Sequence, residues 1–245
     1  MRLFATAIGL SVLGSFGSLF IASGVLVLKP KTRMALVPHL VSYAVGTLLG
    51  VALLSILPEV LEELSAARTG MVLLAGIMCF FVLEKLVLWH HCHSEDCEAH
   101  GRPGALVLVG HAFHCFVDGV AIGAAIQTSV PLAVSTAIAV ALHEVPQQVG
   151  DFAVLLHAGY RRGPALGLSI LSAAGAVAGT IVAFMAFGQL PGFLPYALSF
   201  AAASFLYIAM ADLIPDLHKG RVDARAFRQV LLLLAGIATA YVLGE

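Results

Sequence analysis

The segment HAFHCFVDGVAIGAA, residues 111–125, places two imidazoles, a thiol and a carboxylate within an otherwise apolar run. In a helix with about 3.6 residues per turn, His114 and Asp118 share one face. His111 lies one turn before His114, and Cys115 lies on the adjoining stripe. An ionised carboxylate at the centre of a bilayer costs about 2.5–3.5 kcal/mol, so Asp118 needs a partner. The polar side chains nearest to it in the sequence are all of types that commonly coordinate metal ions.

A second polar segment, ALHEVPQQVGDF at 141–152, lies near the middle of another apolar run. Its polar side chains are His143, Glu144, Gln147, Gln148 and Asp151. Pro146 lacks a backbone donor and leaves a carbonyl near position 142 free to turn inward. We expect the two helices to meet at one polar patch. Imidazole, carboxylate and thiolate together suit zinc first, with iron, manganese and cadmium as further candidates.

A structural explanation of this patch has to be weighed against the metal site. A single histidine in a membrane helix more often bonds to a neighbouring helix than to a metal. Several ionisable groups on two adjacent spans are a different case, because Asp118 and Glu144 would together cost about 5–7 kcal/mol if unpaired. We therefore interpret the patch as a metal site.

The composition indicates an integral membrane protein, since 60% of the residues are hydrophobic and only 11% are charged. Soluble domains carry about 25% charged residues. Apolar runs of roughly 18 or more residues predict transmembrane helices. The predicted spans are 4–28, 37–57, 71–89, 105–126, 131–157, 165–188, 194–214 and 226–243. We expect one all-α membrane domain over residues 1–245, with the first span retained and not cleaved as a signal peptide.

The basic residues predict how the chain crosses the membrane. Apart from Arg2 and Arg68, they lie in or beside alternate connections, which puts both termini outside. The predicted cytoplasmic connections are 29–36, 90–104, 158–164 and 215–225. A net charge of −1 without a basic domain predicts no nucleic-acid partner. No phosphate-binding loop is present, so coupling to nucleotide hydrolysis within this chain is not expected.

The predicted cytoplasmic connection 90–104 contains a tract typical of labile metal binding. Its candidate ligands are His90, His91, Cys92, His93, Cys97 and His100. No CxxC pair with a matching HxxxH follows, so the tract is not a folded zinc finger. Cysteines in a reducing cytoplasm, or within spans, also predict no disulfide framework. We favour a receiving or sensing loop over a solvated connector.

Other polar residues in or beside the spans are candidates for path or supporting roles. They are His111, Gln148, Asp151, Ser169, Ser172 and Asp212. Asp151 fits an exit path as well as helix packing, and Asp212 fits a relay as well as a scaffold hydrogen bond. Three acids at the end of the second span fit either cation attraction at a pore mouth or a solvated helix end. These acids are Glu59, Glu62 and Glu63.

The two polar segments resemble the fourth and fifth transmembrane helices of the ZIP (ZRT/IRT-like) family of divalent-metal transporters. The motifs of that family run approximately H-N-x-x-D-G and H-E-x-P-x-E-x-G-D-F. Here they read HCFVDG at 114–119 and HEVPQQVGDF at 143–152. Similarity extends to FFVLEK at 80–85, GTLLGVALLSILPE at 46–59 and SFLYIAMADLIPDL at 204–217. The resemblance therefore covers most of the chain.

The resemblance implies eight helices in a three-two-three arrangement, with the first and last triplets as inverted repeats. SILPEVL at 55–61 and DLIPDLH at 212–218 fit such an inversion. It also implies a binuclear metal site between helices four and five. Its first ligand set would be His114, Asp118, His143 and Gln147. Its second ligand set would be Cys115, Asp118, Glu144 and Gln147.

The resemblance further implies zinc uptake into the cytoplasm, by a protein that is commonly a homodimer in a lipid bilayer. We expect alternating access around the midplane site, with zinc as the substrate and no organic cofactor. Metal binding must displace protons from the ligands, so acidification should compete with it. A short chain without a large ectodomain fits a bacterial inner membrane protein.

Several residues depart from the family pattern. Cys115 replaces the usual asparagine, and a thiolate there would favour zinc or cadmium. Gln148 replaces the usual glutamate, and Gln147 stands where histidine or glutamate is frequent. Further departures are His111 in place of an aspartate, and Val51 and Ser55 where the second span often carries ligands. We expect one competent metal site, with the other weak or altered in preference.

A metalloprotease is the main alternative, because His143 and Glu144 followed by two residues resemble the H-E-x-x-H motif of zinc peptidases. Position 147 holds Gln instead of the second His, and Pro146 interrupts the helix on which two ligands would align. A metal exporter or sensor with the same site is a third interpretation, which a directional assay separates. We therefore expect a transporter and not an enzyme.

Overall fold

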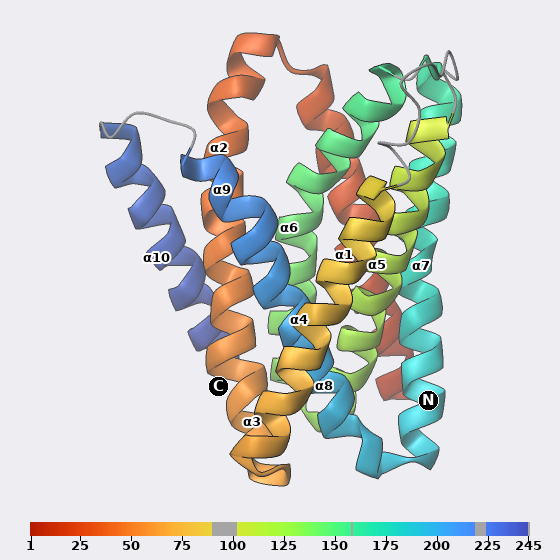
Figure 1. The fold of residues 1–245 in the computed structure, drawn as a ribbon, viewed down its shortest axis with the longest axis vertical. Coiled ribbons are helices and arrows are strands. Elements are labelled where there is room, and N and C mark those ends of the chain that lie inside the picture. The colour runs from red at the N-terminus through yellow and green to blue at the C-terminus, as the bar shows by residue number, and fades with distance from the viewer. Residues whose placement is uncertain (90–101, 158, 219–223, 245) are drawn as a thin grey trace.

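The computed structural model describes residues 1–89, 102–157, 159–218 and 224–244 (Figure 1). The described residues form α1 (Arg2–Val27), α2 (Pro30–Gly50), α3 (Leu57–Glu63), α4 (Ala66–Trp89), α5 (Arg102–Thr128), α6 (Val130–His157), α7 (Arg162–Gln189), α8 (Leu194–Tyr207), α9 (Ile214–His218) and α10 (Ala224–Gly244). Two π-helical segments, η1 (Val51–Ile56) and η3 (Ile208–Leu213), and the short 3-10 turn η2 (Pro191–Phe193) complete them. No strand occurs among these residues, which confirms the all-α class.

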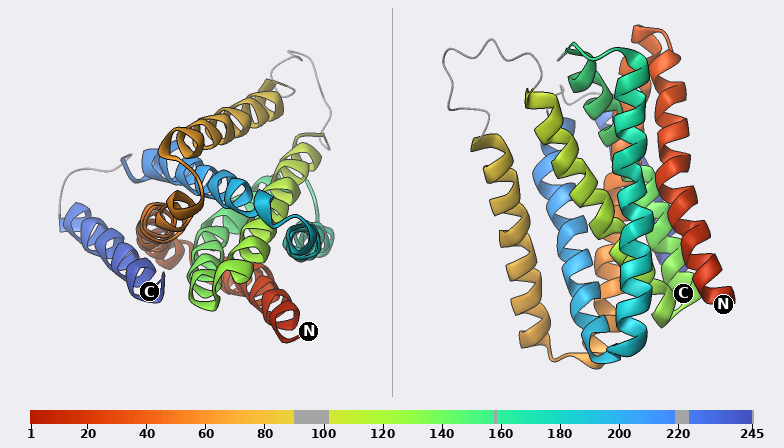
Figure 2. Two further views of the ribbon diagram at one scale, coloured as in Figure 1. Left: turned by 90° about the horizontal axis from the view of Figure 1, so that it is seen from below. Right: turned by 90° about the vertical axis from the view of Figure 1, so that its right-hand side faces the viewer.

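The long helices run side by side along the long axis of the molecule (Figures 1 and 2). In Figure 1, the α1–α2 turn and the end of α6 lie at the upper end. The α3–α4, α5–α6 and α7–α8 turns lie at the lower end, where both chain termini also lie. The chain therefore traverses the bundle alternately up and down and returns to the end at which it began.

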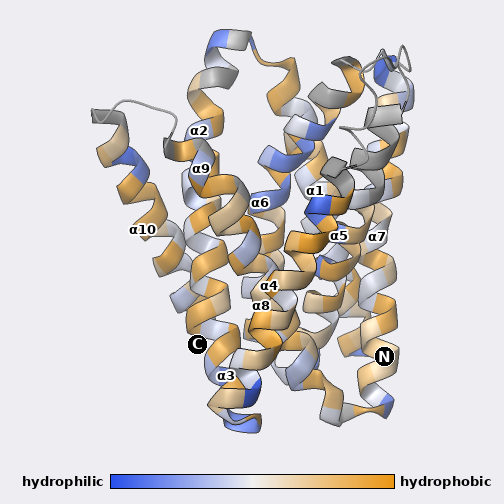
Figure 3. Cartoon of the chain, in the orientation of Figure 1, coloured by the Kyte–Doolittle hydropathy of each residue, from blue (hydrophilic) through white to orange (hydrophobic). Residues whose placement is uncertain are grey.

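Six helical stretches within the described residues are long and apolar enough to cross a membrane (Figure 3). They are Arg2–Val27, Ala35–Glu63, Ala66–Leu86, Arg162–Gln189, Leu194–Ala211 and Ala226–Leu243. These stretches correspond to six of the eight spans expected from the sequence. The other two expected spans form α5 and α6, whose imidazole, carboxylate and amide side chains lower their mean hydropathy.

The expected connection 29–36 is shorter in the structure, because α2 already begins at Pro30. Proline suits the first position of a helix, where its missing N–H leaves no hydrogen bond unmade. The second span is also longer than expected, since the chain continues as helix through η1 and α3 to Glu63. The seventh span likewise continues through η3 and α9 to His218.

The two π-helical segments have the same internal hydrogen bonding. Each ends with an amide that bonds five residues back, from Leu57 to the Ala52 carbonyl and from Ile214 to the Ala209 carbonyl. A proline stands at the second position of the helix that follows in both cases. Proline cannot donate to the carbonyl four residues earlier, and a π turn is a common local adjustment to a break in the α-helical ladder.

Burial also follows the same order in η1 and η3. In each segment the first, second and sixth residues are buried, and the third and fourth are exposed. The buried positions are Val51, Ala52 and Ile56 in η1, and Ile208, Ala209 and Leu213 in η3. η1 and η3 are therefore equivalent in hydrogen bonding and in burial at these five positions, and they overlap the segments 55–61 and 212–218 that fitted an inversion in the sequence.

Glycines let α5 and α7 approach each other at backbone distance. A Cβ atom on Gly119 of α5 would overlap the Ala176 carbonyl of α7. In the reverse direction, a Cβ atom on Gly179 of α7 would overlap the Phe116 carbonyl of α5. Thr180 adds a hydrogen bond of 2.9 Å from its hydroxyl to the Gly119 carbonyl. Small residues of this kind drive helix association in lipid, and here they hold the backbone of α5 in place.

Candidate metal centre

Six side chains with metal-binding atoms gather where α5 and α6 face each other near the middle of the bundle. α5 contributes His111, His114, Cys115 and Asp118, and α6 contributes His143 and Glu144. All six are buried, and His143, Glu144 and Cys115 have no exposed surface. The helix-face argument from the sequence thus predicted residues that the structure brings together.

The first donor group consists of His114, Asp118, His143 and Glu144, whose ligand atoms all lie within 4.8 Å of one another. The Nε2 atoms of His114 and His143 are 3.0 Å apart. The Asp118 Oδ2 atom lies 3.4 Å from His114 Nε2 and 3.3 Å from His143 Nε2. Two imidazole nitrogens and a carboxylate oxygen therefore converge on one point.

The carboxylate of Asp118 is the most demanding member of this group. Its side chain is 1% exposed, yet neither of its oxygens accepts a hydrogen bond from the residues that the structure describes. Burying a charge without hydrogen bonds costs several kcal/mol, so the group requires a positive partner. The two histidine Nε2 atoms beside it provide the remaining donors for a divalent cation.

His143 is oriented by the backbone of its own helix. Its Nδ1 atom lies 2.9 Å from the Ala139 carbonyl oxygen, four residues earlier in α6. Because a carbonyl can only accept, Nδ1 carries the proton and the Nε2 lone pair faces the first donor group. Fixing the tautomer through the second ring nitrogen is the usual way in which proteins orient a histidine ligand.

The second donor group consists of His111, Cys115 and Glu144, with ligand atoms again within 4.8 Å of one another. The Cys115 Sγ atom lies 3.4 Å from His111 Nε2 and 3.4 Å from Glu144 Oε1. His111 Nε2 lies 3.8 Å from Glu144 Oε2. Glu144 is thus a member of both donor groups.

Two further residues of α6, Gln148 and Asp151, contact members of these donor groups. Gln148 is buried and donates a 2.8 Å hydrogen bond from Nε2 to Glu144 Oε2. Asp151 lies with Oδ2 3.1 Å from His111 Nδ1. Sequence reasoning named both residues but missed their partners, because no spacing rule shows which α5 side chain an α6 residue meets.

The remaining candidates from the sequence lie in several places. Gln147 is half-buried on α6, and Ser169 and Ser172 are buried on α7. The Ser169 hydroxyl donates to the Ala165 carbonyl of its own helix at 3.1 Å. Asp212 belongs to η3, and its side chain is outside the described part. The loop candidates His90, His91, Cys92, His93, Cys97 and His100 also lie outside the described residues.

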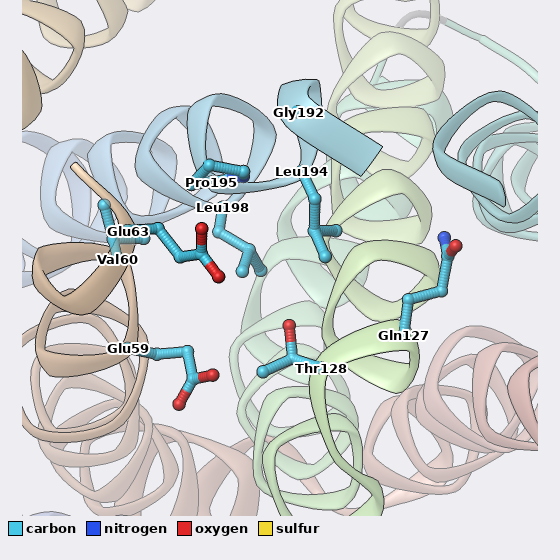
Figure 4. A pocket seen from close by; sticks show the side chains of 9 residues that line it. All are labelled: Glu59, Val60, Glu63, Gln127, Thr128, Gly192, Leu194, Pro195 and Leu198. Atoms are coloured by element: carbon cyan, nitrogen blue, oxygen red, sulfur yellow. The ribbon is translucent and has the colours of Figure 1, made fainter. Parts of the chain in front are cut away.

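A pocket of 420 Å³ opens near the lower end of the bundle, between α3, α5 and α8 (Figure 4). Glu59 and Glu63 extend into it from α3, opposite Thr128 of α5. Its other lining residues are Val60, Gln127, Gly192, Leu194, Pro195 and Leu198. Two of the three acids for which the sequence left a pore mouth and a solvated helix end as alternatives therefore line one pocket.

Residues 88–244 match the family described as ZIP Zinc transporter. The chain belongs to this family. Among curated proteins, zinc transporter ZIP13 of Pongo abelii is 34% identical over 81% of this chain, and zinc transporter ZIP13 of Homo sapiens is 30% identical over 81%. Zinc transporter SLC39A7 of Rattus norvegicus is 28% identical over 97%. The chain covers 64%, 68% and 71% of these relatives, respectively.

Membership of the ZIP family and the buried donor groups together support divalent metal transport. ZIP family members are transporters and not enzymes, which disfavours the metalloprotease alternative. In the structure, Glu144 accepts hydrogen bonds from Cys115 and Gln148.

Proposed function

We propose that this ZIP family protein carries Zn²⁺ across a lipid bilayer into the cytoplasm, through the first donor group. The observation that carries the proposal is the convergence of His114, His143 and Asp118 within 3.4 Å at the centre of the bundle. Nitrogen and carboxylate donors of this kind suit zinc. The relatives described above, all named as zinc transporters, favour the same cargo.

The proposed topology has eight spans in a three-two-three arrangement with inverted repeats. Six apolar helices, together with α5 and α6, supply the spans. The equivalence of η1 and η3 supports an inverted repeat that relates the second span to the seventh. The α1–α2 turn and the end of α6, each followed by basic residues in the sequence, lie toward the upper end of Figure 1, which becomes the cytoplasmic side, with both termini outside. The expected setting is a bacterial inner membrane, with the protein as a homodimer.

The ion path in this proposal runs from the acidic pocket to the buried groups. Glu59 and Glu63 attract hydrated cations at the outer end. At the first donor group the ion exchanges water for imidazole and carboxylate ligands, and protons leave as it binds. Rearrangement of the helices that carry the site then opens it inward. The histidine-containing connection 90–104 is the proposed receiving or sensing element on that side. Cadmium, iron and manganese are the competing cargoes.

Flux into proteoliposomes with an internal zinc reporter tests this function. His143→Ala removes one central donor, and we expect flux to fall to the level of empty liposomes. His39→Ala is the matched control, since His39 also bonds through Nδ1 to a carbonyl four residues earlier, at Ala35, but lies on α2. Flux in His143→Ala as fast as in His39→Ala would refute the proposed path.

Direction is tested by loading zinc inside the same liposomes and separating the two protein orientations by protease protection. Faster movement from the side of the termini supports uptake. Preferential movement from the opposite side would favour an exporter. Zinc binding without flux in either direction would favour a sensor.

A further inference from the structure

We propose that the hydroxyl group of Thr136, on α6, is a stopping point for the ion between the acidic pocket and the first donor group. This inference rests on the proposed function, because it adds a ligand to the outer half of the same ion path. Thr136 lies outside both polar motifs and both donor groups. The ligand it would take is a divalent cation that still carries part of its water shell.

Thr136 carries a buried hydroxyl group without a partner. The residue has no exposed surface, and its Oγ1 atom forms no hydrogen bond with the residues that the structure describes. The other buried threonines of the described chain each donate to a carbonyl three or four residues earlier; they are Thr47, Thr69 and Thr180. An unpaired hydroxyl in such a place destabilises a fold, so Thr136 needs a partner that the chain itself does not supply.

α6 places this hydroxyl on the way from the pocket to the first donor group. Seven residues make about two helical turns, so Thr136 and His143 lie on the same side of α6, roughly 10 Å apart along its axis. α6 runs upward in Figure 1 from the turn that follows Thr128, and Thr128 lines the acidic pocket (Figure 4). Along the axis, Thr136 therefore lies between the pocket and His143.

α8 spans the same interval with apolar side chains. Leu198 lines the pocket, and Phe205, seven residues later on the same side of α8, has its ring centre 6.1 Å from that of His143. Both belong to one buried apolar cluster, which also includes Ile122 of α5 and Val140 of α6. An ion that leaves the pocket for the first donor group has to cross this cluster. The unpaired hydroxyl is therefore a polar atom beside an apolar stretch of the path.

A hydroxyl group suits a brief stop better than tight binding. Its oxygen is neutral, so it can replace one water molecule on a divalent ion and release the ion again. Its O–H group can donate to a water molecule at other times. Passage of an ion requires binding that favours entry but still allows exit. The hydroxyl thus replaces part of the water shell beside the apolar cluster, and the charged ligands of the first donor group then hold the ion.

Zinc flux into proteoliposomes tests the role of the hydroxyl. Thr136→Val keeps the shape of the side chain and removes the oxygen. We expect the maximal flux to fall by about 10–100-fold, since an interaction with a charged group contributes about this much to a rate. Zinc affinity in isothermal titration should not change. Thr136→Ser, which retains the hydroxyl, should keep most of the flux. Thr69→Val is the matched control, because the Thr69 hydroxyl already donates to the Ser65 carbonyl.

A purely structural role of Thr136 gives the opposite result. Removal of an unpaired buried hydroxyl without a change of shape should leave flux unchanged and keep or raise thermal stability. Normal flux in Thr136→Val would therefore overturn the inference. A joint loss of flux, zinc affinity and thermal stability would also overturn it, because that combination indicates damage to the fold.

Thiol labelling tests the same position without relying on transport. Thr136→Cys is introduced into the full chain after all four native cysteines have been replaced by serine. The reagent is a positively charged, water-soluble methanethiosulfonate, which follows the route of a hydrated cation. Ser11→Cys is the control, since Ser11 is also buried with an unpaired hydroxyl but lies on α1, which contributes no described residue to the pocket or the donor groups. We expect reaction at position 136 and none at position 11.

The two experiments separate this inference from the proposed function. No reaction of Thr136→Cys, or equal reaction of Ser11→Cys, would overturn the inference. Zinc flux that Thr136→Val leaves unchanged would overturn it too and leave transport intact. Reaction confined to Thr136→Cys, in a protein whose parent chain carries no zinc, would support a cation route to Thr136 and overturn transport. Selective labelling together with loss of flux in Thr136→Val supports both proposals.

Discussion

The two donor groups share Glu144 but are held in different ways. In the first, the His143 ring is oriented by the Ala139 carbonyl of its own helix, and the donors are nitrogen and oxygen. In the second, His111 Nδ1 lies 3.1 Å from Asp151 Oδ2 of the other helix, and one donor is sulfur.

This difference shows how one pair of helices provides two unlike donor groups. A carbonyl four residues back in a helix stays in place as long as the helix does, so His143 keeps its orientation if α6 moves relative to α5. The distance between His111 and Asp151, by contrast, depends on how α5 packs against α6. We therefore expect the first donor group to be the more permanent and the second to respond to movement of the helices.

The largest expected effect comes from the residue that the two groups share. Glu144→Gln removes the charge from both at once and keeps the shape. We expect zinc flux, and the affinity for the ion bound at each donor group, to fall by more than about 100-fold. Substitution of a residue that only holds a ligand in place typically costs about 10–100-fold. Isothermal titration and the liposome assay measure this. Glu84→Gln on α4, where the carboxylate accepts from Tyr207, is the matched control. A loss of affinity at only one donor group would show that Glu144 binds metal in that group alone.

Substitutions at the contact between α5 and α7 test whether this contact fixes the position of α5, which carries residues of both donor groups. Gly179→Ala places a methyl group on the Phe116 carbonyl and should lower the free energy of unfolding by about 1–3 kcal/mol. Gly167→Ala on the same helix meets nothing within 4 Å and should be neutral or stabilising. Thermal unfolding in detergent compares the two. Equal stability would mean that α7 does not set the place of α5.

Replacement of Cys115 tests whether a sulfur atom in the second donor group favours cadmium over manganese. Cys115→Asn exchanges sulfur for an amide oxygen in the second donor group only. We expect the ratio of cadmium to manganese flux to fall by about tenfold, equivalent to about 1.4 kcal/mol. Competition between the two ions in liposomes gives this ratio. Cys79→Ser, on the exposed side of α4, should not change it.

The smallest expected effect concerns the hydrogen bond that supports Glu144. Gln148→Met keeps the side-chain length and removes the 2.8 Å donor. A hydrogen bond to a charged group contributes about 1.5–3 kcal/mol, but the bound metal replaces part of it. We expect zinc affinity, measured by isothermal titration, to fall only about 3–10-fold. A fall as large as that in Glu144→Gln would make Gln148 a ligand in its own right.

Several features could be predicted from periodicity alone. The apolar runs predicted the helices, and the spacing of His114, Cys115 and Asp118 predicted one polar face on α5. That face had to be buried, because ionised groups in a membrane helix need partners. The π turns at η1 and η3 were not predicted. A proline in an apolar run signals a disturbed helix but not the form that the disturbance takes.

The sequence by itself determined which residues are available for chemistry and on which helices they lie, since composition and helical repeat depend on neighbours in the chain. Only the tertiary structure decided how they are grouped. The spacing allowed Asp118 to pair with Cys115, yet the structure places it with His114 and His143, and places His111 with Cys115. The physical reason is that the rotation and axial offset of α5 against α6 are set by contacts between helices, such as that of Gly119 with Ala176, which no local pattern contains.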